Sequence, residues 1–306
     1  CGHWEDPVTC KANEHGIIEN AYEKGYAAAK PPRVRTGKKV AIIGGGPSGL
    51  TSAYFLQLMG HQTTVFEKRK KLGGMLLYGI PSYRLPRERL QDDINVILET
   101  GVEVRLETSV GNDPGQLSLD ELRKEYDAIY IAIGAHQDKK TGIPGENSKN
   151  VISAVEMLRA IGDNEMPDFT GKQVVVIGGG NVAMDVTRSS IRLGADKVTC
   201  VYRRRQADMT ALPDEITGAL AEGAELMTLA APVRIEADED GAAKALWVQP
   251  QIIGEVDKAG RPRPGKAALE EVRIPADVIV VAIGQGVEIQ GFDQAGVPIQ
   301  RGAFVA

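Results

Sequence analysis

Glycines recur at a fixed spacing in two parts of the chain. The pattern G-x-G-x-x-G, with Gly or Ala in the last place, is formed by Gly44, Gly46 and Gly49 and again by Gly178, Gly180 and Ala183. The first glycine of such a pattern permits a tight turn, the second lets backbone approach a diphosphate, and the last position permits close helix packing. A helix that begins at this turn presents N–H groups to an anion. The pattern therefore indicates binding of a dinucleotide diphosphate at two places.

Both patterns stand in the order of elements that such a site requires. The runs "KKVAII" and "KQVVVI" precede the glycines and predict strands, and the helix that follows each pattern ends at Gly60 or Gly194. Each of these closing glycines lies 16 residues after the first glycine of its pattern. The chain thus contains an internal repeat, which predicts an α/β fold with two Rossmann-like dinucleotide-binding domains. The alternative is that one of the two units keeps the fold but no longer binds a dinucleotide.

The two units differ at the end of their second strand. In "TTVFEK" the strand ends at Glu67, whose carboxylate can accept hydrogen bonds from an unphosphorylated ribose, as in FAD or NAD. In "VTCVYRRRQ" the matching position is Arg203, followed by Arg204 and Arg205, and guanidinium groups suit a 2′-phosphate. The first site therefore suits FAD and the second NADP(H), with NAD(H) less favoured; Arg205 is the arginine expected to point away. A solvated surface cluster is the alternative for these arginines.

Composition restricts the class of protein. The 306 residues carry 36 Lys and Arg against 41 Asp and Glu, a net charge of −5, which gives no basic field for nucleic acid. No apolar run predicts a membrane span, and the N-terminus has no signal pattern. Three cysteines, Cys1, Cys10 and Cys200, make no disulfide framework, and Cys200 is expected to be a buried free thiol in a strand. A cytoplasmic chain is expected.

Several longer motifs resemble one family. They are "GGMLLYGIPSYRLP" (73–86), "GGGNVAMD" (178–185) and "VYRR" (201–204), with "YDAIYIAIGA" (126–135) and "ADVIVVAIGQ" (276–285) as crossover segments between nucleotide domains. From about residue 14 to its end, the chain resembles the two-dinucleotide flavoproteins, and within them the small (β) subunit of glutamate synthase and its relatives. The resemblance implies FAD and NADPH as cofactors.

The resemblance also implies which residues contact cofactor. For FAD these are Gly44, Gly46, Pro47, Ser48, Gly49, Glu67, Lys68, Gly73, Gly74 and Arg84, with the segment Met75 to Pro86 lying along the flavin. For NADPH they are Gly178, Gly180, Asn181, Ala183, Arg203 and Arg204, and the crossovers add Gly134 and Gly284. Asp185 is expected in the first turn of the second helix, either as a favourable helix-dipole charge or near the nicotinamide.

Metal binding is a separate hypothesis. The family has an N-terminal helical module whose cysteines hold two [4Fe–4S] clusters, and residues 1–32 resemble its tail. Only Cys1 and Cys10 are available there, fewer than the four thiolates of one cluster. These two residues are candidate iron–sulfur ligands with an incomplete set. His3 and His15 are expected to be surface or capping residues, and no spacing predicts a zinc site.

The expected architecture has one nucleotide domain inserted in the other. A helical segment spans 1–32, the FAD domain spans 33–150 and resumes at 286–306, and the NAD(P)H domain spans 151–285. An amphipathic helix is expected near 86–100, and residues 236–274 are expected to form strands joined by a polar hairpin loop. The family's final Gly-Asp segment is missing at "RGAFVA", so we expect either a fragment of a longer polypeptide or a chain that has lost part of the flavin site.

Three functions remain open from the sequence. No C-x-x-C pair is present, which disfavours a thioredoxin-reductase-like dithiol route. The leading hypothesis is an NADPH-oxidising FAD subunit that passes single electrons through iron–sulfur centres to a partner subunit in a hetero-oligomer, as in glutamate synthase, with no catalytic side chain needed beyond the cofactors. The alternatives are the flavin subunit of an electron-bifurcating transhydrogenase or hydrogenase, and a non-catalytic interaction subunit.

Overall fold

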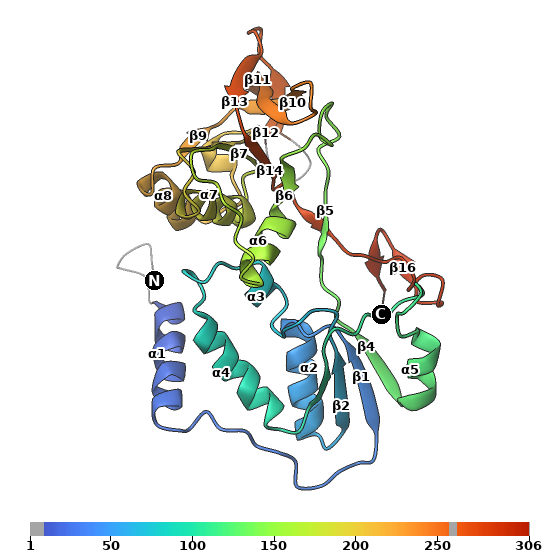
Figure 1. Ribbon diagram of the computed structural model, residues 1–306. Coiled ribbons are helices and arrows are strands. Elements are labelled where there is room, and N and C mark those ends of the chain that lie inside the picture. Colours follow the sequence, from blue (N-terminus) through green and yellow to red (C-terminus); the bar gives the residue numbers. More distant parts are fainter. Residues whose placement is uncertain (1–8, 257–261, 306) are drawn as a thin grey trace. The chain divides into compact units, whose positions relative to one another are not determined.

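The computed structural model describes residues 9–256 and 262–305, which divide into two compact units (Figure 1). The first unit holds the described residues up to Gly73, together with Arg87–Ile133 and Gln294–Gly296. The second holds Gly74–Pro86, Gly134–Asp293 and the described residues from Val297 onward. The second unit thus interrupts the first at 74–86 and at 134–293, and the first resumes only at 294–296. The sequence assigned residues 134–150 and 286–306 to the first domain, whereas the second unit takes in 134–150, 286–293 and the described residues from 297 onward.

The first unit is built on a four-stranded parallel sheet in the order β3-β2-β1-β4. The strands are β1 (Lys39–Ile43), β2 (Gln62–Phe66), β3 (Glu103–Arg105) and β4 (Ala128–Ile131). Helix α2 (Pro47–Leu58) packs against β1 and β2, and α4 (Arg87–Leu98) packs against α2. The unit also contains α1 (Cys10–Glu23) and α5 (Leu119–Glu125), whose Ser118 and Glu121 form a capping box.

The predicted amphipathic helix is confirmed as α4. Leu90 and Ile94, one turn apart, are buried on its inner face. Its outer side holds α1 through polar contacts: Arg89 forms an ion pair with Glu19 at 2.8 Å, and the Tyr22 hydroxyl donates to Asp93. Since α1 buries no side chain, polar contacts of this kind are what attach it to the unit.

The second unit has a five-stranded parallel sheet in the order β6-β14-β7-β8-β9. The strands are β6 (Val151–Ser153), β7 (Gln173–Ile177), β8 (Lys197–Val201), β9 (Glu225–Met227) and β14 (Val278–Val281). The associated helices are α3 (Met75–Tyr78), α6 (Ala154–Gly162), α7 (Asn181–Arg192), η1 (Gln206–Asp208) and α8 (Pro213–Ala221).

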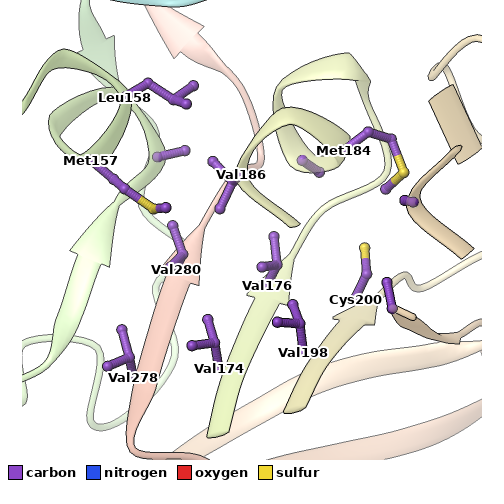
Figure 2. Close-up of a cluster of buried hydrophobic side chains, with 14 of the residues drawn as sticks. Met157, Leu158, Val174, Val176, Met184, Val186, Val198, Cys200, Val278 and Val280 are labelled. Atoms are coloured by element: carbon purple, nitrogen blue, oxygen red, sulfur yellow. The ribbon is translucent and has the colours of Figure 1, made fainter. Parts of the chain in front are cut away.

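Alternate residues of three neighbouring strands form the core of this unit. Figure 2 shows Val278, Val174 and Val198 in one row, with Val280, Val176 and Cys200 in the next, all facing Met157, Leu158, Met184 and Val186 of the helices α6 and α7. The other face of the sheet, including Val175 and Ile279, packs against an antiparallel sheet. Burial on both faces explains the uninterrupted apolar runs, and each fully buried valine of this kind stabilises the fold by roughly 1.5–3 kcal/mol.

The antiparallel sheet confirms the predicted hairpins. Its strands are β10 (Ala230–Ala237), β11 (Ala243–Val256), β12 (Pro262–Lys266) and β13 (Val272–Pro275), with β11 pairing to the other three. Two short pairs complete the chain: β5 (Gln137–Asp138) with β15 (Gln285–Gly286), and β16 (Ile299–Gln300) with β17 (Ala303–Phe304). No helix among the described residues has both the length and the apolar character needed to cross a bilayer.

Candidate dinucleotide-binding sites

The glycine turn of the first unit follows β1 directly. Gly44 has a φ of +110°, and a Cβ there would lie 2.4 Å from the carbonyl oxygen of Ala132, just beyond β4. A Cβ on Gly49 would lie 1.9 Å from the Gly44 carbonyl oxygen. Both positions therefore require glycine, the first because of the left-handed backbone and the second because the helix and the turn touch.

The N-terminus of α2 is free of protein caps. Gly46 occupies the N-cap and no side chain bonds to the first turn, while Pro47 at the first position lacks an N–H. Ser48 is exposed beside it and Gly49 is buried. The N–H groups of this turn have no intrahelical partner, so they can donate to an anion. This geometry fits a diphosphate.

Glu67 lies immediately after β2 and organises the turn. It is buried, its Oε2 accepts from the Gly45 N–H at 2.7 Å, and its Oε1 accepts from the Arg69 N–H at 2.9 Å. Each carboxylate oxygen has a second lone pair, so these bonds do not exclude a ribose hydroxyl. Gly73 donates from its N–H to the Gly45 carbonyl at 2.8 Å, which joins it to the same turn, whereas Lys68 is exposed.

The second unit repeats this construction. Gly178 has a φ of +157°, and a Cβ there would lie 2.3 Å from the carbonyl oxygen of Ala282, just beyond β14. Gly180 is the N-cap of α7, again without a side-chain cap, and Ala183 is fully buried where the first unit has Gly49. The internal repeat thus includes the neighbouring strand, because in both units a carbonyl just beyond that strand lies against the first glycine of the turn.

A loop after β8 closes over this second turn, which sequence reasoning missed. Thr210 and Ala211 both donate from their N–H groups to the Gly179 carbonyl, at 3.0 and 3.1 Å. Asn181 accepts from the Leu212 N–H at 2.9 Å, and the Tyr202 ring covers Gly179, where a Cβ would lie 2.4 Å from it. The only sequence signal was an asparagine at the first position of the helix.

The three arginines after β8 have different surroundings. Arg203 is exposed. Arg204 donates from Nε to the Pro262 carbonyl at 3.2 Å, which ties it to β12. Arg205 forms an ion pair with Asp208 at 2.8 Å, and this pair lowers the pKa of the Asp208 carboxyl. Arg203 is therefore the most available of the three for a phosphate ligand.

The glycines at the crossovers also adopt left-handed backbone. Gly134 and Gly284 have φ of +68° and +119°, both are exposed, and the Gly284 carbonyl accepts from the Lys139 N–H at 3.1 Å. Gly73 and Gly74 have φ of +117° and +50°, where the chain passes from the first unit to the second. None of these observations tests contact with a cofactor, which remains a prediction.

Arg84 lies in an ion-pair network with α7 and α8. Its Nη1 donates to both carboxylate oxygens of Asp185 at 2.8 Å, and its Nε lies 2.9 Å from Glu215. Arg188 pairs with Glu215 at 2.8 Å and with Glu222 at 2.7 Å, and Arg192 pairs with Glu222 at 2.8 Å. We call these six residues the α7 ion-pair network.

The placement predicted for Asp185 was wrong. Helix α7 begins at Asn181 and has no acidic residue in its first turn, so Asp185 lies in the second turn, outside the range of a helix-dipole contact at the terminus. Its side chain is buried, with 3% of the residue exposed. Burial raises the pKa of Asp185 to about 6, against the opposing effect of Arg84.

The cysteines and histidines show no metal site in the described part of the chain. Cys10 is exposed at the start of α1, Cys1 and His3 lie outside the described residues, and His15 is on the surface of α1 near Glu19. Within residues 9–256 and 262–305, no three or more His, Cys, Asp or Glu side chains are grouped so that they could hold a metal ion. Cys200 is a buried free thiol, as predicted, and burial raises its pKa to about 12.

Two glycine turns of this construction are typical of flavoproteins that use pyridine nucleotides, and the family comparison agrees. Residues 38–306 match the model of the pyridine nucleotide-disulphide oxidoreductase family. The chain belongs to this family. A putative glutamate synthase [NADPH] small chain of Cereibacter sphaeroides is 36% identical over 285 residues, covering 90% of this chain and 68% of the relative. The predicted family, which includes glutamate synthase small chains, is therefore confirmed.

Other relatives are longer than this chain. The NADP(+)-dependent formate dehydrogenase subunit beta of Moorella thermoacetica is 42% identical over 262 residues, covering 85% of this chain but 36% of the relative. The NADPH-Fe(3+) oxidoreductase subunit beta of Geobacter sulfurreducens is 37% identical over 288 residues, with 92% and 42% covered. The chain thus spans less than half the length of these two relatives.

Solved structures confirm the predicted fold class. FprA from Mycobacterium tuberculosis superposes with a TM-score of 0.71 at 21% identity, covering 88% of this chain and 76% of the other. Thioredoxin reductase of Lactococcus lactis superposes with a TM-score of 0.62 at 20% identity, covering 88% and 84%. At these identities the similarity concerns the fold alone.

We expect Gly49→Ala to lower the free energy of unfolding by about 2–3 kcal/mol, because the methyl group must displace helix or turn backbone. Gly16→Ala is the control, since a Cβ at Gly16 has no heavy atom within 4 Å. Thermal unfolding followed by circular dichroism measures both. Equal midpoints for Gly49→Ala and the unmodified protein would contradict the steric requirement.

We expect Asp185→Asn to change how stability depends on pH. Since the pKa of Asp185 is raised from 3.8 to about 6, its contribution is present below the ordinary value and is lost as pH rises through about 6. The unmodified protein should therefore lose stability relative to Asp185→Asn across this window. Denaturant unfolding at a series of pH values tests this, with the exposed Glu225→Gln as control. A pH-independent gap between Asp185→Asn and the unmodified protein would show that the burial does not act on this carboxyl.

Proposed function

We propose that the chain is the NADPH-oxidising, FAD-containing electron-input part of a larger enzyme. One observation carries this proposal: the two turns are built alike, but the strands beside them end in opposite charges. The first has the buried carboxylate of Glu67, and the second has the exposed guanidinium of Arg203. A carboxylate accepts from ribose hydroxyls, whereas a guanidinium pairs with a 2′-phosphate, so the two sites take different dinucleotides.

In the first unit, the N–H groups at the start of α2 would hold the FAD diphosphate. Ser48 and Gly49 lie in this turn, and Glu67 accepts a hydrogen bond from it and would face the adenosine ribose. The family resemblance adds Pro47, Lys68, Gly73 and Gly74 to the contacts. The left-handed φ values of Gly73 and Gly74 support a close approach of their backbone to the cofactor.

In the second unit, the start of α7 would hold the NADPH diphosphate. Gly180 leaves this end uncapped, and Asn181 shapes the loop that covers the turn. Arg203 and Arg204 would pair with the 2′-phosphate, with Arg204 oriented by its bond to Pro262. Arg205 contributes less because Asp208 already holds it.

The cofactors would supply the redox chemistry, since bound FAD takes a hydride from NADPH and can release electrons one at a time. The chain supplies binding, orientation and charge. The names of the relatives include subunits of multi-subunit enzymes, which supports transfer of the electrons to a partner subunit, by way of iron–sulfur centres as in glutamate synthase. Cys10 and Cys1 are candidate ligands of an iron–sulfur centre on that route.

A second candidate function keeps both nucleotide sites but has a different partner subunit and the opposite direction of electron flow. The relative with 42% identity is named as an NADP(+)-dependent formate dehydrogenase subunit, which favours a partner that supplies electrons for reduction of NADP⁺. Mass spectrometry of proteins that co-purify with the full-length protein separates the candidates. A glutamine-hydrolysing large subunit supports the first, and a formate-oxidising subunit supports the second.

We expect Arg203→Ala to weaken the binding of NADPH but not the binding of NADH. Loss of a charge-assisted pair with the 2′-phosphate should raise the KM for NADPH about tenfold to a hundredfold, whereas NADH has no phosphate to lose. Steady-state reduction of an artificial dye by each nucleotide measures this, and the exposed Arg123→Ala in the first unit is the control. Equal effects on both nucleotides would contradict the assignment of Arg203.

We expect the native complex, purified without oxygen, to show flavin absorption bands that bleach on addition of NADPH. The reason is that two intact dinucleotide sites would place both cofactors in one chain. Visible spectroscopy before and after addition of each nucleotide is the measurement. A colourless complex would show that the fold is retained without redox function, and bleaching by NADH alone would refute the second-site assignment.

A further inference from the structure

The segment Gly74–Pro86 is fixed to the second unit at both of its ends. Near its start, α3 packs on α6 so closely that a Cβ on Gly162 would lie 2.9 Å from the Leu77 carbonyl oxygen and 3.1 Å from the Tyr78 Cα. Near its end, the Tyr83 ring lies under the guanidinium of Arg192 at 4.1 Å and that of Arg188 at 4.7 Å. The next residue in the chain, Arg84, forms the ion pairs with Asp185 and Glu215.

Arg84 is mostly occupied by carboxylates. Its Nη1 donates to both oxygens of Asp185, and its Nε reaches Glu215, so two of its three nitrogens serve α7 and α8. The side chain is about three-quarters buried, at 23% exposure, and Asp185 at 4% is more deeply buried. A guanidinium with these contacts is placed to compensate buried charge, and little of it remains for a ligand.

The charges of the α7 ion-pair network balance. Three guanidinium groups, of Arg84, Arg188 and Arg192, face three carboxylates, of Asp185, Glu215 and Glu222. Asp185 is four residues beyond Asn181, which corresponds to about 6 Å along the helix from the phosphate-binding end. Arg84 lowers the pKa of Asp185, so without Arg84 the carboxyl would keep its proton to a higher pH. Above that pH, a buried uncompensated carboxylate would stand behind the turn where an anion must bind.

We propose that Arg84 is a positioning residue that acts through Asp185: it holds the segment 74–86 on α7, and its charge allows the N-terminus of α7 to accept a dinucleotide diphosphate. This proposal rests on the proposed NADP(H) site of the second unit. It differs from the expectation that Arg84 contacts cofactor directly. The two roles predict different outcomes when the charge of Asp185 is removed as well.

The test uses the full-length flavoprotein and four variants: Arg84→Gln, Arg84→Lys, Asp185→Asn, and Arg84→Gln combined with Asp185→Asn. Calorimetric titration with NADP⁺ at about pH 9, where the Asp185 carboxyl is ionised in every variant that keeps it, gives the dissociation constant, and amide hydrogen exchange reports the order of residues 79–86. Lys197→Gln is the matched control, because it removes an exposed cation from the same unit, 2.9 Å from Glu225.

We expect Arg84→Gln to raise the dissociation constant of NADP⁺ about tenfold, as for one uncompensated charge at this range, and to speed exchange in residues 79–86. In the double variant, affinity should return to within about threefold of the unmodified protein, since the uncompensated charge is gone. Exchange should stay fast, because the segment is still untied. Lys197→Gln should change neither quantity.

Two results would overturn the proposal. If affinity in the double variant stays as weak as in Arg84→Gln, then Arg84 contacts the nucleotide directly. If Arg84→Gln speeds exchange but leaves affinity unchanged, the network is only structural. Should Arg84→Gln fail to fold, Arg84→Lys keeps the charge but loses the forked contact, so unchanged affinity with faster exchange is expected, and weakened affinity would count against the proposal. An unmodified protein that binds no NADP⁺ would refute the proposed function, while the exchange data would still test the attachment of the segment.

Discussion

Each nucleotide-binding unit depends on the close approach of one glycine to one carbonyl group. The first glycine of each turn lies where a Cβ would be 2.4 Å or 2.3 Å from the carbonyl of Ala132 or Ala282, at the end of the neighbouring strand. This approach brings the ends of two parallel strands together and starts the next helix with its N–H groups uncapped. The turn that starts each helix, and with it the proposed anion site, depends on that contact.

The same backbone plan would serve two ligands because the residues proposed to distinguish them lie at the end of the second strand, outside the glycine turn. Glycines and buried valines build both units, whereas the residues at the end of the second strand differ in charge. Glu67 is also part of the construction, since it accepts from the Gly45 N–H, and Arg203 takes no comparable part. Changing Arg203 should therefore alter the choice of nucleotide with little effect on the fold, whereas changing Glu67 would affect both.

The helix α7 connects a proposed ligand site with a segment that the sequence assigned to the other domain. Its N-terminus bears the glycine turn, and its second and third turns bear Asp185, Arg188 and Arg192. Buried ion pairs of this kind add little net stability over apolar packing, but removal of one member is costly because the remaining charge is uncompensated. The network therefore makes the position of residues 74–86 specific.

The sequence by itself determined the family, the α/β fold, both glycine turns and the burial of Cys200. These are local patterns: glycine spacing, strand and helix periodicity, and charge at a strand end are read from adjacent residues. Only the tertiary structure decided that Arg84 pairs with Asp185 and that the loop at Thr210 covers the second turn. Asp185 lies 101 residues from Arg84 in the sequence, and no local periodicity encodes a pairing at that separation. Burial of Asp185 follows in turn from the packing of α7 on α8 and from the contact of Arg84, which come from separate parts of the sequence.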